Sequence, residues 1–118
     1  MLPAPGQGAL AVEIRKDNKE LERILTKIDN IKIRRLIDIE REILNNVGGG
    51  CSIPIGTIAI SKPDSLDVMA CVVDPQTGKK MIIKETNWKG RTKELAKTIS
   101  TKLLSNGGKN IISKYNYQ

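Results

Sequence analysis

The sequence contains no histidine and no phenylalanine, and it has only one tryptophan, two tyrosines and two cysteines among 118 residues. Because aromatic side chains are scarce, we expect a core built from isoleucine, leucine and valine. Two cysteines without histidine exclude a conventional zinc site, and they are too few for a disulfide framework. No apolar run approaches the roughly 18 residues of a membrane-spanning helix, and no signal-peptide pattern opens the chain. The sequence therefore predicts a cytoplasmic protein in a reducing compartment, without a metal and without membrane contact.

The charge of the chain is strongly positive: 20 Lys and Arg residues against 13 Asp and Glu residues give a net charge of +7. A basic surface suits nucleic acid, acidic partners or ligands with several carboxylates. The lysines are spread among polar positions, so a solvated surface also explains them. Hydrophobic residues make up 39% of the chain, which together with its length suits one globular domain.

Residues 47–56 form the most unusual stretch, in which three consecutive glycines precede Cys51 and Pro54 follows it. Glycine has no Cβ, so this run allows positive φ angles and a close approach of the backbone to a ligand. Pro54 fixes its own φ and stiffens the far side of the loop. Two interpretations are open. Cys51 is either a nucleophile on an accessible tip or a small packing residue that follows a glycine helix cap.

The N-terminal residues are expected to be separate from the domain that the rest of the chain forms. Residues 2–8 contain two prolines and two glycines, which exclude a helix. Residues 9–14 alternate between large apolar and small or polar side chains, which predicts a strand. A strand needs a neighbour, so we expect residues 1–15 to belong to the preceding domain of a larger protein and residues 16–118 to form a separate domain. In isolation this strand would lack fixed partners or pair with a second copy of the chain.

Two helices are expected next, at residues 17–28 and 31–47, with Asp17 or Asn18 and Asp29 or Asn30 as their caps. Apolar residues recur along both at helical spacing. They are Leu21, Ile24, Leu25 and Ile28 in the first, and Ile33, Leu36, Ile37, Ile43, Leu44 and Val47 in the second.

Glu40 falls inside the apolar stripe of the second helix. An unpaired carboxylate buried there would be costly. Either Glu40 lies at the edge of the stripe and reaches water, or it accepts hydrogen bonds from a neighbouring loop or pairs with an arginine.

Three strand-like runs follow, at residues 55–61, 66–73 and 79–86, with turn signals between them. The middle run is apolar on both faces, which indicates a central strand or one whose outer face meets another domain. Its cysteine, Cys71, is expected to be a packing residue.

Two more helices are expected at the end of the chain. Residues 88–90 lead into a helix over residues 91–104, glycines at 107–108 end it, and a short helix follows at 109–115. The order of elements predicts an α+β domain: a three-stranded antiparallel sheet with helices packed on one face.

Two motifs at this separation resemble those of one enzyme family. Residues 2–9 read LPAPGQGA, with Glu13 and Arg15 close behind, which is similar to the LPAxGQGA…E-x-R segment of hydroxymethylbilane synthase, also called porphobilinogen deaminase. Residues 49–56 read GGCSIPIG, which resembles the GGCxxPIG loop of that family. The Glu-Arg pair at 40–41 and the Asn-Gly-Gly at 106–108 are similar to the family as well. The resemblance spans nearly the whole chain, but only about the C-terminal third of the family's three-domain chain.

The resemblance implies a chemical role for Cys51. In the family the matching cysteine holds a dipyrromethane cofactor through a thioether, and four porphobilinogen units are added before water releases hydroxymethylbilane. Carried over, Cys51 is the cofactor-binding residue, and Gly49 and Gly50 shape its loop. A thiolate is the strongest common side-chain nucleophile, which suits capture of an electrophilic pyrrole methylene. Ser52 and Ile53 stand where many members have Gln and Val, which leaves the thiol untouched.

The resemblance also implies what is missing. Gln7 and Arg15 match positions in the segment that returns to the family's first domain near the substrate cleft. The family's catalytic aspartate, and most arginines that bind substrate carboxylates, lie upstream of the matched region. We therefore expect a monomeric transferase of tetrapyrrole (haem) biosynthesis as the parent protein, and a fragment that is inactive alone and carries no cofactor. Its partners would be porphobilinogen and the two upstream domains, and the fragment would self-associate through its N-terminal strand.

Two other classes of function compete with this interpretation. A small basic RNA-binding module would need aromatic residues on a sheet face, and only Trp88, Tyr115 and Tyr117 are available, all outside the predicted strands. A structural interaction module would contain an inert Cys51. We expect no binding to nucleic acid. The reactivity of the Cys51 thiol distinguishes the two interpretations that remain, a cofactor-carrying domain and a structural interaction module.

Overall fold

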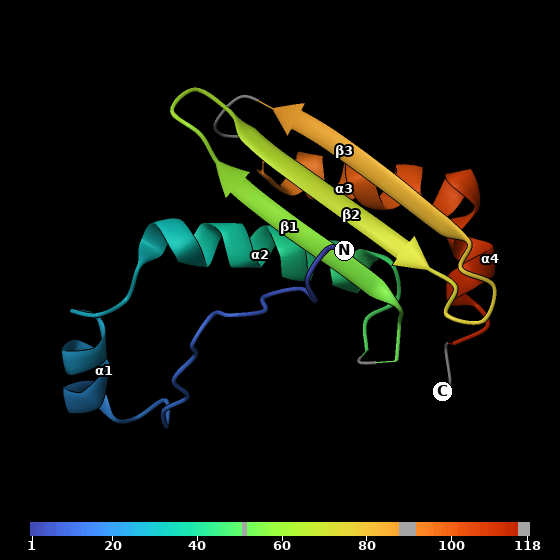
Figure 1. The fold of residues 1–118 in the computed structure, drawn as a ribbon. Coiled ribbons are helices and arrows are strands. Elements are labelled where there is room, and N and C mark those ends of the chain that lie inside the picture. The colour runs from blue at the N-terminus through green and yellow to red at the C-terminus, as the bar shows by residue number, and fades with distance from the viewer. Residues whose placement is uncertain (51, 88–91, 116–118) are drawn as a thin grey trace.

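The computed structural model describes residues 1–50, 52–87 and 92–115. The predicted lead-in at residues 88–90 therefore lies outside the described residues. Within them the chain forms a three-stranded antiparallel sheet, in the order β1-β2-β3, and a layer of helices (Figure 1). The elements in chain order are α1 (Lys19–Leu25), α2 (Ile31–Asn46), β1 (Ile55–Ser61), β2 (Leu66–Val73), β3 (Lys80–Asn87), α3 (Thr92–Leu103), the π-helical turn η1 (Leu104–Gly108) and α4 (Lys109–Ile112).

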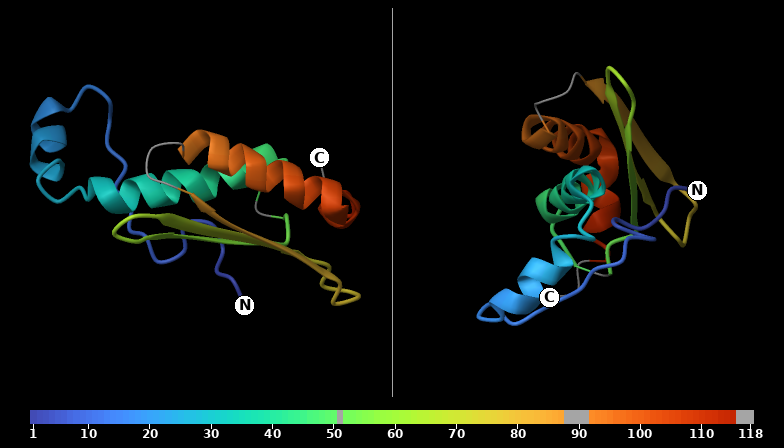
Figure 2. Two further views of the ribbon diagram at one scale, coloured as in Figure 1. Left: turned by 90° about the horizontal axis from the view of Figure 1, so that it is seen from above. Right: turned by 90° about the vertical axis from the view of Figure 1, so that its left-hand side faces the viewer.

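Helices α2, α3 and α4 lie on one face of the sheet, and in the described part of the chain no helix covers the other face (Figure 2). This arrangement confirms the α+β fold with helices on one face. The strands are in antiparallel register, with Thr57 opposite Ala70 and Ala70 opposite Ile83. The structure also confirms β2 as the central strand.

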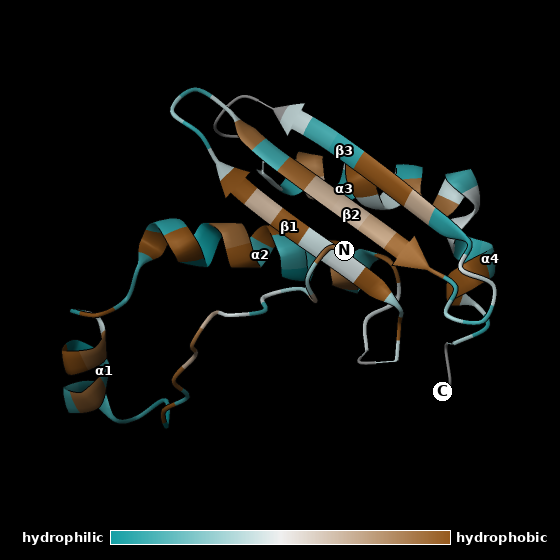
Figure 3. Ribbon diagram, in the orientation of Figure 1, coloured by the Kyte–Doolittle hydropathy of each residue, from teal (hydrophilic) through white to brown (hydrophobic). Residues whose placement is uncertain are grey.

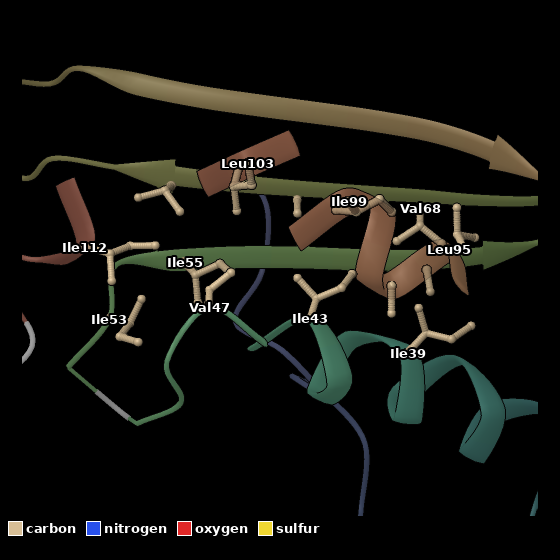
Figure 4. Packing of buried hydrophobic residues seen from close by; sticks show 14 of the residues in the cluster. Ile39, Ile43, Val47, Ile53, Ile55, Val68, Leu95, Ile99, Leu103 and Ile112 are labelled. Atoms are coloured by element: carbon tan, nitrogen blue, oxygen red, sulfur yellow. The ribbon is translucent and has the colours of Figure 1, made fainter. Parts of the chain in front are cut away.

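The core lies between the sheet and the helices and is aliphatic, as the lack of phenylalanine predicted. Ile43 of α2, Val68 of β2, and Ile99 and Leu103 of α3 are fully buried. Their side chains lie between the two layers in Figure 4. Figure 3 shows apolar residues in all three strands and apolar residues interrupted by polar ones along α2. Burial of these aliphatic side chains is the main favourable contribution to folding.

Cys71 is a buried residue of β2, opposite Gly56 of β1. Its neighbours Ala70 and Val72 face the helices, so Cys71 lies on the other face of the sheet. Desolvation raises the pKa of its thiol above the ordinary value. A buried, protonated thiol is a weak nucleophile, which agrees with the prediction that Cys71 is a packing residue.

Helix α2 begins after Asn30, whose side-chain oxygen accepts hydrogen bonds from the N–H groups of Lys32 and Ile33. This confirms Asn30 as the cap. The C-terminal half of α2 packs on the sheet through Ile39 and Ile43, whereas Ile33 is exposed. The predicted stripe was therefore wrong at Ile33, because only the C-terminal half of the helix lies over the sheet. It also lacked Ile39, which is buried in that half.

Helix α1 is shorter than predicted, and its apolar face is not buried. It spans Lys19–Leu25, and Ile24 is 54% and Ile28 74% exposed. Figure 1 shows α1 at a distance from the sheet. An amphipathic pattern leads to burial only where a partner surface exists, and the described residues offer none there.

Residues 9–14 do not form a strand, so this prediction was wrong. Leu10 is 101% and Val12 65% exposed. An alternating pattern gives a strand only where a neighbour supplies backbone hydrogen bonds. The expectation that the N-terminal residues lack fixed partners was wrong only for the first residues. There the N–H of Thr57 in β1 donates to the carbonyl oxygen of Pro3 at 2.8 Å, whereas in the described structure residues 9–14 have no strand partner.

The C-terminal elements follow the prediction with shifted ends. Strand β3 begins at Lys80, one residue late, and α4 ends at Ile112, three residues early. Between α3 and α4 the backbone kinks at Gly107, whose φ is +107°. Glycine adopts this angle without the strain that a Cβ would cause, so the glycines end α3 as predicted.

A buried carboxylate, Asp74, joins the turn after β2 to the C-terminal residues. It accepts hydrogen bonds from Nζ of Lys114 at 2.8 Å, from the hydroxyl of Tyr115 at 2.9 Å and from the N–H of Gln76 at 3.0 Å. These donors, Lys114 before the others, hold the pKa of Asp74 well below its ordinary value. The network fixes the residues after α4 to the end of the sheet.

We expect this network to make folding stability acid-sensitive. In the unfolded chain Asp74 takes up a proton near its ordinary pKa of 3.8, whereas the folded protein keeps it ionised to much lower pH. The unfolded state therefore binds more protons below about pH 4.5, and the contribution of Asp74 is complete above that pH and is lost as the pH falls. Asp74→Asn should be less stable at neutral pH and should lose less further stability in acid.

Urea unfolding at several pH values between about 2.5 and 7 measures this difference. The control is Asp64→Asn, at an exposed turn residue without a hydrogen-bond partner in the described structure. Equal acid slopes for Asp74→Asn and the parent chain would contradict the assignment.

Candidate functional site

The loop between α2 and β1 starts with an abrupt end to the helix. The N–H of Gly49 donates to the carbonyl oxygen of Leu44 at 2.9 Å, and the N–H of Gly48 donates to that of Asn45 at 3.2 Å. The next φ angles are +125° at Gly48, +65° at Gly49 and +97° at Gly50. Three successive positive φ angles explain why the sequence places three glycines here.

Both ends of this loop are anchored in the core. Val47 before the glycines and Ile53 after the cysteine are buried, and Figure 4 shows them on the two arms of the loop. The N–H of Val73 in β2 donates to the carbonyl oxygen of Pro54 at 3.1 Å, which ties the exit of the loop to the sheet. The tip therefore stands between two fixed points.

Cys51 itself lies outside the described residues. Its neighbours Gly50 and Ser52 are exposed. A Cβ placed on Gly49 or Gly50 would meet nothing within 4 Å, so the space around this part of the loop is open. The open space beside Gly49 and Gly50 and the nucleophilic sulfur of a cysteine at position 51 suit the covalent attachment of a group. The described residues contain no cluster of three or more Cys, Asp or Glu that could hold a metal ion.

Gln7 and Arg15 are not brought to this loop by any contact in the described structure. The Gln7 side chain accepts a hydrogen bond from the N–H of Ala4 at 3.0 Å, within its own turn. Arg15 is exposed and pairs with Asp17 at 3.5 Å. Figure 1 shows the chain after the first residues running away from the sheet toward α1. The cleft roles implied for both residues remain predictions.

Glu40 lies on α2, the helix that leads into this loop, and the sequence left its role open. It is 6% exposed, and its Oε2 accepts a hydrogen bond from the N–H of Gly6 at 2.7 Å. Its Oε1 accepts one from the N–H of Ala59 in β1 at 2.9 Å. This confirms the interpretation in which Glu40 accepts hydrogen bonds from a neighbouring loop. The sequence offered two signals for this residue: its position in an apolar stripe and the Glu-Arg pair at 40–41.

In the part of the chain that the structure describes, no helix combines the length and hydropathy needed to span a membrane.

We expect substitutions at Gly49 to separate backbone strain from steric clash. The space is open, so Gly49→Ala should be destabilised only because alanine at a φ of +65° costs about 1–2 kcal/mol. Asn tolerates this region better, so Gly49→Asn should lose less stability than Gly49→Ala. Urea unfolding of both variants measures the difference. Full stability of Gly49→Ala would contradict the observed loop geometry.

Comparison with known proteins places this site in a family. A family model described as "Porphobilinogen deaminase, C-terminal domain" matches residues 34–105. The porphobilinogen deaminase of Oceanobacillus iheyensis is 37% identical over 113 residues, which are 96% of this chain and 36% of that protein. That of Staphylococcus aureus (strain Newman) is 35% identical over 119 residues, covering 100% of this chain and 38% of the relative. The porphobilinogen deaminase of Acidothermus cellulolyticus is 47% identical over 79 residues, which are 64% of this chain and 24% of that protein.

The chain therefore spans little more than a third of the length of the curated relatives that it matches over nearly its whole length. The matched family region includes all but the first three residues of α2, the cysteine loop, the sheet and α3. The chain belongs to the porphobilinogen deaminase family, within which it corresponds to the C-terminal domain.

Proposed function

We propose that this chain is the cofactor-carrying domain of a hydroxymethylbilane synthase, a transferase of tetrapyrrole (haem) biosynthesis. In the parent protein, Cys51 would anchor a dipyrromethane primer, and four porphobilinogen units would be joined to it with release of ammonia. The observation that carries the proposal is the loop itself: the space around Gly49 and Gly50, which precede Cys51 in the sequence, is open, and the residues on either side, Val47 and Ile53, are buried in the core.

The residues of this chain would supply attachment and not the bond-forming chemistry. The Cys51 thiolate is the nucleophile for the link, and a thioether resists the repeated proton transfers that would hydrolyse an ester. When bound, the dipyrromethane supplies the pyrrole end to which the next unit is joined. The open space around Gly49 and Gly50 leaves room for a bulky group, while Val47 and Ile53 hold the base of the loop in place.

The remaining functional groups would come from the rest of the parent chain. The family's catalytic aspartate is expected upstream of the matched region, so we propose that the fragment is inactive alone and is produced without cofactor. The division into residues 1–15 and 16–118, and cleft roles for Gln7 and Arg15, are part of the same proposal. So are a cytoplasmic location and a monomeric parent protein.

The alternative of an RNA-binding module has less support. Of the three aromatic residues, Trp88 and Tyr117 lie outside the described residues, and the hydroxyl of Tyr115 donates to Asp74. The Tyr115 ring packs against the core and is not placed on a sheet face. Stacking on bases needs exposed rings, so no described aromatic residue provides for it.

We expect Cys51 to react with a thiol reagent much faster than Cys71 in the folded chain. Cys51 lies between exposed residues, whereas Cys71 is buried and its thiol has a raised pKa. Alkylation with iodoacetamide, followed by peptide mass spectrometry, measures both rates. Cys71→Ala should keep the fast reaction and Cys51→Ala should lose it. A Cys51 as slow as Cys71 would favour the structural module.

A chimaera tests the proposed function directly. Residues 34–115 replace the matching region of the Staphylococcus aureus relative, which supplies the rest of a complete chain. The purified chimaera should carry extra mass equal to two condensed pyrroles and should consume porphobilinogen. The Cys51→Ala chimaera should lose both properties, and the Cys71→Ala chimaera should keep both. A folded chimaera with unmodified mass would overturn the assignment of Cys51.

A further inference from the structure

Residues 2–8, which we call the N-terminal strap, lie against the strand that leaves the cysteine loop. The carbonyl oxygen of Pro3 accepts a hydrogen bond from the N–H of Thr57 at 2.8 Å. Thr57 lies only six positions after Cys51 in the sequence. The strap and the exit of the loop therefore share the first residues of β1.

The strap packs directly against the backbone of Gly56 in β1. A Cβ on Gly56 would lie 2.8 Å from the carbonyl oxygen of Leu2 and 2.9 Å from its Cβ. Real Cβ atoms do not approach backbone atoms so closely, so any other residue here would push the strap away. The φ of Gly56 is not in the left-handed region. Glycine is required at this position by the strap and not by the local backbone angle.

Glu40 holds the strap at a second point. One carboxylate oxygen accepts from Gly6 in the strap and the other from Ala59 in β1. The strap continues with a turn in which the N–H of Gln7 donates to the carbonyl oxygen of Ala4 at 2.9 Å. Glu40 thus joins this turn to β1 through a single buried side chain.

The outer edge of β1 explains why both contacts matter. In this antiparallel sheet β1 pairs with β2 on one side, and the N–H groups of Thr57 and Ala59 point to the other side. An edge strand needs partners for such groups, and the strap and Glu40 provide them. A hydrogen bond to an ionised carboxylate is stronger than one between neutral groups.

We propose that Gly56 and Glu40 are positioning residues that clamp the N-terminal strap to β1, so that the strap and the Cys51 loop are held as one unit. Gly56 leaves the space in which Leu2 of the strap packs, and Glu40 binds the strap and β1 through hydrogen bonds. The consequence for cofactor attachment rests on the proposed function. The clamp would fix the Ala4–Gln7 turn relative to β1, where the loop that carries Cys51 ends. The clamp itself is a property of this chain and can be tested without any cofactor.

Amide exchange followed by NMR on the 118-residue chain tests the clamp. In Gly56→Ala, exchange at Thr57 and Gly6 should accelerate by about tenfold or more relative to Val73, whose partner is Pro54, because the added Cβ displaces the strap. In Glu40→Gln, the amide nitrogen that replaces one oxygen cannot accept, so exchange should accelerate at Gly6 or Ala59. Both variants should also change the alkylation rate of Cys51.

Matched controls separate the clamp from general destabilisation. Gly78→Ala introduces alanine at a φ of +70° in open space, away from the strap, and Glu42→Gln alters an exposed residue on the same helix. Neither should accelerate exchange at Thr57 relative to Val73, nor change alkylation of Cys51. If Gly56→Ala fails to fold, the Glu40→Gln variant still decides.

Unchanged exchange at Gly6, Thr57 and Ala59 in the folded variants would overturn the clamp. Faster exchange with unchanged alkylation of Cys51 would overturn the coupling between strap and loop. Neither result affects the chimaera experiment, in which only the mass on Cys51 is decisive. Failure of the clamp and failure of the proposed function are therefore distinguishable.

Discussion

The packing of α2 against β1 is the interaction on which the rest of the structure depends. Val47 at the end of α2 and Ile55 at the start of β1 are both buried in one aliphatic core, together with Ile53 between them. The two ends of the cysteine loop are therefore fixed by apolar burial, which is not directional but is strong in aggregate. The glycines between them carry no side chain to bury, so the tip is free of the core that holds its base.

The second constraint is the hydrogen-bonding demand of an edge strand. Strand β1 has β2 on one side only, and its other side is satisfied by a carbonyl of the strap and by the carboxylate of Glu40. A buried carboxylate is tolerated here because it accepts two N–H donors. The same two contacts place residues from the beginning of the chain against β1, the strand that follows the loop, and so connect segments that lie about 40 residues apart in the sequence.

The proposed function assigns this domain a tether and leaves the bond-forming groups to other parts of the parent protein. This division is physically reasonable, because a growing product must move relative to a fixed set of catalytic groups. A covalent anchor on an open glycine loop permits such movement at the tip, and the buried arms limit it at the base. The two thiols of the chain differ for the same reason. Cys71 is desolvated within the sheet, whereas Cys51 follows in sequence three glycines, and the space around two of them, Gly49 and Gly50, is open.

The sequence by itself determined the elements with strong local signals: the Asn30 cap, the three strands, the glycine break after α3 and the loop around Cys51. These depend on neighbours within a few residues, so pattern and propensity suffice. Only the tertiary structure decided which apolar faces find a partner, because burial depends on elements distant in sequence. It left α1 and residues 9–14 exposed, paired Asp74 with Lys114 across 40 residues, and gave Glu40 its two donors. The alternation at residues 9–14 was read correctly as apolar and polar, but a strand is a property of two segments, and one sequence pattern cannot supply the second.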